Sequence, residues 1–108
     1  MKSGDIWLVD LTDGKGHEQR GIRSAIIFGS ANGIVMVVPL TSNVNTARLS
    51  HTHAISPDEH NGLDTESIAL VFQMVSLDRE RFHHRIGTIG EDHRLAIAAL
   101  IRDLMGLD

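Results

Sequence analysis

Five short runs of apolar and β-branched residues, separated by clusters of Gly, Asn, Asp and Ser, fill most of the chain up to Val75. These runs cover residues 5–11, 23–28, 34–40, about 47–55 and 67–75. The pattern is typical of antiparallel strands in a small barrel or sandwich. The dipeptide Asn32-Gly33 between the second and third runs favours a two-residue hairpin, because that turn needs positive φ at both central residues. We therefore expect the second and third strands to pair directly.

The spacing of the apolar residues changes near the C-terminus. A helical stripe is formed there by Ile97, Leu100, Ile101, Leu104 and Met105. Glu91 and Asp92 precede the stripe, where the dipole of a helix N-terminus favours acids, and Gly106 suits a C-terminal stop. At 108 residues, the chain is long enough for one core and too short for two. The sequence therefore predicts a single domain over residues 1–108, mostly antiparallel β with one terminal helix.

The net charge of −4 does not by itself suggest a nucleic-acid-binding protein. The charge is uneven, because residues 49–78 hold five acids and no Lys or Arg, whereas the flanking regions carry all ten basic residues. A polyanion would have to use those flanks. The chain has no cysteine, no signal-like N-terminus and no apolar run near the roughly 20 residues that span a bilayer. We expect a soluble protein of the reducing cytoplasm.

The stretch GKGHEQRGIR, residues 14–23, places polar side chains between two expected strands. Its cations are Lys15, Arg20 and Arg23, and an arginine can hold two phosphate oxygens at once. His17 exchanges protons near neutral pH, Glu18 can accept one, and Gln19 can hydrogen-bond a base or sugar. A base, an acid and fixed positive charge are the requirements for metal-independent cleavage of a phosphodiester by its own 2′-hydroxyl. A charged, solvated hairpin loop is the competing interpretation.

A second polar break follows the third expected strand, which is apolar through Leu40 and continues into Thr41, Ser42 and Asn43. Hydroxyls and an amide just past a buried strand end can bind phosphate or a base edge. Ordinary turn chemistry would also explain these three residues.

Taken in order, the segments GDIWLVDL, GHEQRGIR, VVPLTSN and NTAR resemble the MazF, PemK and Kid family of toxin endoribonucleases. The resemblance is most specific over roughly the first 50 residues, and it resumes loosely at residues 73–78 and in the terminal helix. It implies an SH3-like barrel and a homodimer. It also implies sequence-selective cleavage of single-stranded mRNA without a metal or other cofactor, and neutralisation by a cognate antitoxin.

The resemblance also implies roles for individual residues. Arg23 matches the family's catalytic arginine and Thr41 its catalytic hydroxyl residue, while Glu18 and Gln19 match the EQ pair and His17 a histidine of the Kid branch. Arg23 and Thr41 would stabilise the scissile phosphate, and His17 or Glu18 would transfer protons, giving 2′,3′-cyclic phosphate and 5′-hydroxyl ends. The expected RNA-binding residues are Lys15, Gln19, Arg20, Ser42, Asn43 and Arg48.

Three departures from the family pattern limit this assignment. Ser24 stands where the family usually has proline, which would hold Arg23 extended, so we expect either a looser arginine or a weakened toxin. Leu70 and Phe72 replace an arginine and an aspartate of the Kid branch, which favours a mechanism resting on Arg23 and Thr41. The acidic segment 49–78 would repel RNA if it bordered the groove.

Other functions are compatible with the same residues. A gyrase-inhibiting module of the same fold, like the related CcdB toxins, and a degenerate member that retains only antitoxin binding both stay open. His51 and His53 should share one strand face, but the seven histidines lack the short paired spacing of zinc sites, so we expect no metal. Trp7 and Phe82 are expected in the core rather than as stacking platforms.

Overall fold

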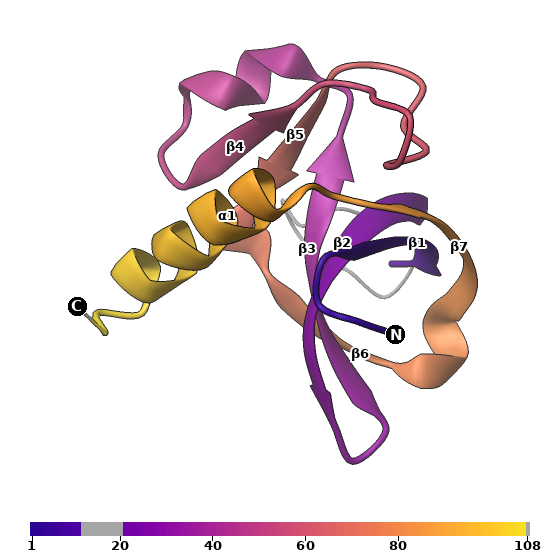
Figure 1. Cartoon of the computed structure of the whole chain (residues 1–108). Coiled ribbons are helices and arrows are strands. Elements are labelled where there is room, and N and C mark those ends of the chain that lie inside the picture. The colour runs from indigo at the N-terminus through magenta and orange to yellow at the C-terminus, as the bar shows by residue number, and fades with distance from the viewer. Residues whose placement is uncertain (12–20, 108) are drawn as a thin grey trace.

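The structure is a computed structural model that describes residues 1–11 and 21–107. Over these residues the strands and helices follow in the order β1 (Asp5–Asp10), β2 (Ile22–Ala31), β3 (Ile34–Thr41), η1 (Val44–Arg48), β4 (Thr52–Ile55), β5 (Ser67–Leu70), η2 (Val71–Gln73), β6 (Val75–Asp78), η3 (Arg79–Arg81), β7 (Phe82–Thr88) and α1 (Glu91–Leu104) (Figure 1). The three η elements are single turns of 3-10 helix.

The strands pair antiparallel along the path β4-β5-β3-β2-β1-β7, and β6 also pairs with β3. β3 is the centre of this arrangement, because its first half pairs with β6 and its last two residues pair with β5. The strands curl around one another as in a small barrel, although the pairings of the described residues do not close into a ring (Figure 1). The predicted fold class, mostly antiparallel β with a terminal helix, is confirmed.

The hairpin between β2 and β3 turns at Asn32-Gly33, as predicted. Both residues have positive φ, 55° and 80° respectively, and the neighbouring residues Ala31 and Ile34 pair directly. Glycine adopts this backbone region without the steric cost that a Cβ would add. The hairpin fixes the register of β3 and therefore the position at which this strand ends.

Two apolar clusters fill the interior. The first lies between the sheet and α1, with Ile6, Ile26 and Ile97 fully buried in it. The second lies on the other side of β1 and β2, where Trp7 and Phe82 pack edge to face with ring centroids 6.0 Å apart. Both aromatic residues are partly buried and pack against this cluster, as expected for residues of the core rather than stacking platforms.

Helix α1 begins at Glu91 and so includes the two acids expected in its first turn. Arg94 donates two hydrogen bonds to the Glu91 carboxylate, at 2.6 and 2.8 Å. The helix ends before Gly106, whose N–H donates to the Asp103 carbonyl at 3.1 Å. The predicted stripe is only partly buried, because its last residues lie in the final turn beyond the sheet, where Met105 is 57% exposed. None of the described helices is long and apolar enough to cross a membrane.

Several predicted strand boundaries were wrong. The run at 47–55 is a 3-10 turn followed by β4, and the run at 67–75 is divided by η2 into β5 and β6. β7 was not predicted, because two shifts in its register with β1 remove the two-residue alternation that identifies a strand. His51 lies before β4 with φ 57°, so it does not share a strand face with His53.

The same two histidines connect the β4 segment to α1. His51 Nε2 lies 2.8 Å from Asp103 Oδ2, and His53 Nε2 lies 2.9 Å from His93 Nδ1. The second contact requires one imidazole to donate and the other to accept. Burial, and secondly the neighbouring His93, lower the pKa of His53 below its ordinary value of 6.5. Protonation of His53 therefore acts against the packing of α1 on β4.

We expect the protein to lose stability as the pH falls through 6.5. Between 6.5 and the lower folded pKa of His53, the unfolded chain binds more protons than the folded chain, so the free energy of unfolding decreases with falling pH. Urea unfolding at several pH values from about 7.5 to about 5 measures this slope. His53→Gln should flatten the slope and His83→Gln, an exposed residue of β7, should not. Equal slopes for the parent and both variants would contradict the assignment.

Candidate active site

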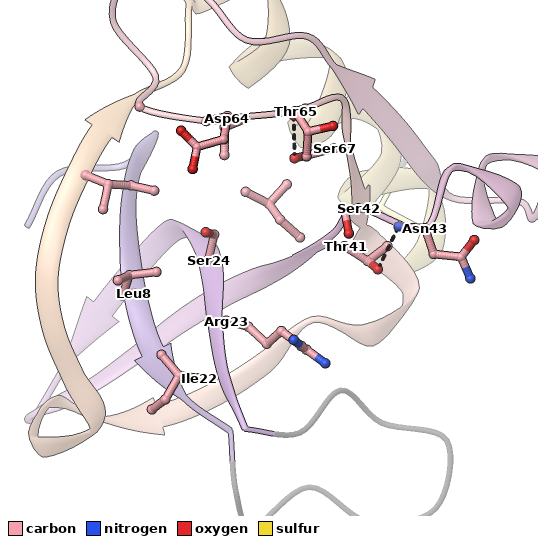
Figure 2. Close-up of a pocket in the computed structure, with 14 residues that line it drawn as sticks. Leu8, Ile22, Arg23, Ser24, Thr41, Ser42, Asn43, Asp64, Thr65 and Ser67 are labelled. Atoms are coloured by element: carbon pink, nitrogen blue, oxygen red, sulfur yellow. Dashed lines mark hydrogen bonds between the residues drawn. The ribbon is translucent and has the colours of Figure 1, made fainter.

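A cavity of about 530 Å³ opens between the start of β2, the end of β3 and the loop that precedes β5 (Figure 2). Its described lining consists of Leu8, Ile22, Arg23, Ser24, Leu40, Thr41, Ser42, Asn43, Gly62, Leu63, Asp64, Thr65, Ser67 and Ile86. Three segments that are distant in the sequence thus meet at one surface, and two of them are the polar breaks identified in the sequence.

Arg23 is the second residue of β2, where the strand leaves the core. Its backbone pairs with Val9, and the next residue, Ser24, pairs with Leu8. This ladder supplies the extended backbone that a following proline would otherwise impose at Arg23. The side chain of Arg23 is exposed and lines the cavity, so its guanidinium can meet a ligand there.

Thr41 is the last residue of β3 and pairs with Ile68 of β5, immediately after the buried Leu40. The Thr41 Oγ1 accepts a hydrogen bond from the backbone N–H of Asn43 at 3.2 Å (Figure 2). This contact orients the hydroxyl and leaves its hydrogen to be donated to a ligand. The strand end therefore holds a hydroxyl donor at the edge of the cavity.

Ser42 and Asn43 line the cavity beside Thr41. The side-chain oxygen of Asn43 already accepts a hydrogen bond from the backbone N–H of Asn45 at 3.2 Å, which caps η1. An RNA contact from Asn43 would use its amide NH₂ group or the second lone pair of that oxygen. Asn43 therefore both caps the turn of η1 and lines the cavity, so the two interpretations of this segment are compatible.

The third wall, residues 62–67, was not predicted as part of the site. Asn61 holds it in place and is fully buried. Its side-chain oxygen accepts from the backbone N–H groups of Asp58 and Leu63, at 3.2 and 3.0 Å, and its amide donates to the carbonyl of Ser56 at 2.9 Å. The signal in the sequence was a second Asn-Gly pair, Asn61-Gly62, which marks a tight turn.

Asp64 brings the acidic segment to the cavity. Arg23 and Asp64 are the two lining residues with charged side chains among those that the structure describes. The other acids of the segment do not line it, and Glu66 accepts a hydrogen bond from the Ser56 hydroxyl at 2.6 Å. Of the acidic segment 49–78, only the Asp64 carboxylate therefore borders the described cavity, where it could repel RNA.

Several residues expected in the site do not line the cavity or lie outside the residues that the structure describes. Arg48 ends η1 and is exposed, but it does not line the cavity. Leu70 is buried, and Phe72, 40% exposed in η2, lies outside the cavity lining. The remaining expected residues, Lys15, His17, Glu18, Gln19 and Arg20, lie outside the described residues. No group of three or more His, Asp or Glu side chains suited to a metal ion occurs within residues 1–11 and 21–107.

The arrangement can hold a phosphodiester between a guanidinium and several hydroxyls. Arg23 offers two parallel donors to phosphate oxygens, and Thr41 and Ser42 offer hydroxyl groups on the adjoining strand end. The cavity is open, and its apolar lining includes Leu8 and Ile86. Such a site can bind one nucleotide unit of a longer strand, with the backbone at Arg23 and a base against the opposite wall.

Known proteins resemble this chain over nearly its whole length. A family model described as a PemK-like, MazF-like toxin of type II toxin-antitoxin systems matches residues 2–105. The chain is 26% identical to Endoribonuclease MazF of Staphylococcus epidermidis, with all of this chain and 93% of that protein covered. Among solved structures, it is similar to MazF of Deinococcus radiodurans, with a TM-score of 0.82, 22% identity, and 98% and 96% of the two chains covered. The MazE-MazF complex of the same organism matches with a TM-score of 0.74, 22% identity and coverage of 100% and 97%.

Proposed function

Because the chain belongs to the PemK-like, MazF-like toxins of type II toxin-antitoxin systems, we propose that it is a sequence-specific endoribonuclease that cleaves single-stranded mRNA. The observation that carries this proposal is that Arg23 and Thr41, from the ends of two different strands, line the same cavity. The relative in Staphylococcus epidermidis, named an endoribonuclease, supports it.

In the proposed reaction, the 2′-hydroxyl oxygen of the RNA attacks the neighbouring phosphorus, and the bond from phosphorus to the 5′-oxygen breaks. Arg23 stabilises the charge that develops on the phosphate oxygens, and the Thr41 hydroxyl donates to the same group. One proton leaves the 2′-hydroxyl and one reaches the departing 5′-oxygen, and we assign this transfer to His17 or Glu18. The products are a 2′,3′-cyclic phosphate and a 5′-hydroxyl end.

The partners follow from the same family membership. The similar Deinococcus radiodurans protein forms a complex with MazE, and we propose that a cognate antitoxin likewise covers the Arg23 side of the cavity of this chain. We also propose a homodimer, which would lengthen a shallow site into a groove for RNA, and a cytoplasmic location, where mRNA is translated. The family match over residues 2–105 supports treating residues 1–108 as one toxin domain.

Gyrase inhibition is the weaker candidate. Neither the family description nor the names of the relatives above support it. A degenerate toxin that binds only an antitoxin would have no use for an arginine and a hydroxyl donor in one cavity. Cleavage therefore explains more of the site than protein binding alone.

We expect the purified protein to cut a long single-stranded RNA in the presence of EDTA. Cuts should fall at a short repeated motif and leave cyclic-phosphate and 5′-hydroxyl ends, because the reaction uses the RNA's own hydroxyl. Primer extension maps the cuts. The new 5′ ends should ligate to an adaptor only after phosphorylation by a kinase, which identifies them as 5′-hydroxyl ends. Intact RNA after incubation with folded protein, or cleavage that stops on addition of EDTA, would contradict the proposal.

A further inference from the structure

Asp64 has no role in the proposed reaction, yet it lines the cavity that contains Arg23 (Figure 2). No hydrogen bond or ion pair joins these two side chains, or engages Asp64 with another residue, in the part of the chain that the structure describes. The carboxylate is exposed to the cavity. An isolated negative charge in the same cavity as a phosphate-binding arginine weakens RNA binding unless it meets hydrogen-bond donors of the RNA itself.

The loop that carries Asp64 is built to hold it in one place. Gly62 has φ +69°, and a Cβ there would overlap the carbonyl oxygen of Ile86 in β7. A Cβ on Gly87 would likewise overlap the backbone of Asn61. Together with the three hydrogen bonds of the buried Asn61 side chain, these backbone contacts fix the wall against β7. The loop backbone that carries Asp64 is therefore held in place against β7, and the carboxylate projects from a fixed position.

Glu66, two residues after Asp64, has a partner within the protein, because its carboxylate accepts a hydrogen bond from the Ser56 hydroxyl. The hydroxyl of Ser67, another lining residue, donates to the Thr65 carbonyl at 3.1 Å. Of the two acids in the loop, the structure thus directs only Asp64 to the cavity.

We propose that Asp64 is a specificity-determining residue that accepts hydrogen bonds from the amino group of a base next to the scissile phosphate. This inference rests on the proposed ribonuclease function. An ionised carboxylate only accepts hydrogen bonds. Guanine, adenine and cytosine each carry an exocyclic amino donor, whereas uracil offers a single N3–H flanked on both sides by carbonyl oxygens that repel a carboxylate. Asp64 therefore disfavours uracil at this position.

The test uses an RNA library with randomised positions around the cleavage site, digested by the parent protein, Asp64→Asn and Glu66→Gln. Sequencing of the cut ends gives the preference at each position. In the parent, one position next to the cut should reject uracil by about tenfold or more. Asp64→Asn should reduce that rejection by about tenfold, because an amide can both donate and accept, and should leave the other positions unchanged. Glu66→Gln removes the same charge outside the cavity and should behave as the parent does.

Two results would overturn the inference. If Asp64→Asn speeds cleavage at every sequence equally, the carboxylate acts only through charge repulsion. If the parent accepts uracil at all positions beside the cut, Asp64 reads no base. In either case the parent still cleaves RNA, so the proposed function survives. Absence of cleavage by the folded parent would instead remove the proposed function and this inference together.

Discussion

Arg23→Ala is expected to lower RNA cleavage by at least about 100-fold while leaving the protein folded. The guanidinium is an exposed group at the start of β2, so its loss removes stabilisation of the phosphate without opening the core. Removing a preorganised donor aimed at developing charge has an effect of this order in other enzymes. Measurement of kcat/KM on a short RNA that contains the mapped motif, with circular dichroism as the folding check, tests it.

Two control variants sharpen this experiment. Arg48→Ala removes another exposed cation that does not line the cavity, so it should change cleavage little. Arg23→Lys keeps the charge but loses the planar pair of donors, and it should recover only part of the rate. A parent-like rate for Arg23→Ala would remove the central assignment of the site, and equal losses for both alanine variants would reduce the role of Arg23 to general attraction of RNA.

The elements that could be predicted are those determined by residues within the same short segment of sequence. β1, β2 and β3 alternate or run apolar between clear turn signals, and Asn32-Gly33 specifies the hairpin by its own backbone preference. β7 has no such local pattern. Its two register shifts relative to β1 break the two-residue alternation, and they depend on pairing with a strand far away in the sequence. The end of β5 was missed for a related reason, since the chain after Ser67 is apolar up to Val75 except for Gln73 of η2.

The same distinction applies to the candidate site. Arg23 and Thr41 could be predicted because each stands just outside a recognisable strand, within a motif of a known family. That both line one cavity depends on β2 and β3 being neighbours, which the hairpin implied. Asp64 could not be predicted, because its position depends on contacts between residues 60–62 and 86–88 that no local pattern records.

Gly62→Ala is expected to lower the free energy of unfolding by about 3 kcal/mol or more. Alanine at φ +69° is strained, and its Cβ would also overlap the backbone carbonyl of Ile86, which cannot move aside as a flexible side chain could. Ile86 is the extra residue of a bulge between the pairs Ile6–Gly87 and Trp7–Arg85, so the carbonyl belongs to the sheet itself. The loop must therefore separate from β7 or the bulge must rearrange.

Gly29→Ala is the matched control, because Gly29 also lies at a bulge, in β2, but has no atom within 4 Å of a Cβ and no positive φ. It should change the midpoint of urea unfolding little. If the Gly62→Ala protein were as stable as the Gly29→Ala protein, the loop could move away from β7 without loss of folding free energy. The backbone that carries Asp64 would then not be held rigidly. If Gly62→Ala is destabilised but still folds, it should keep cutting RNA through Arg23 and lose the rejection of uracil, because only the wall that carries Asp64 has moved.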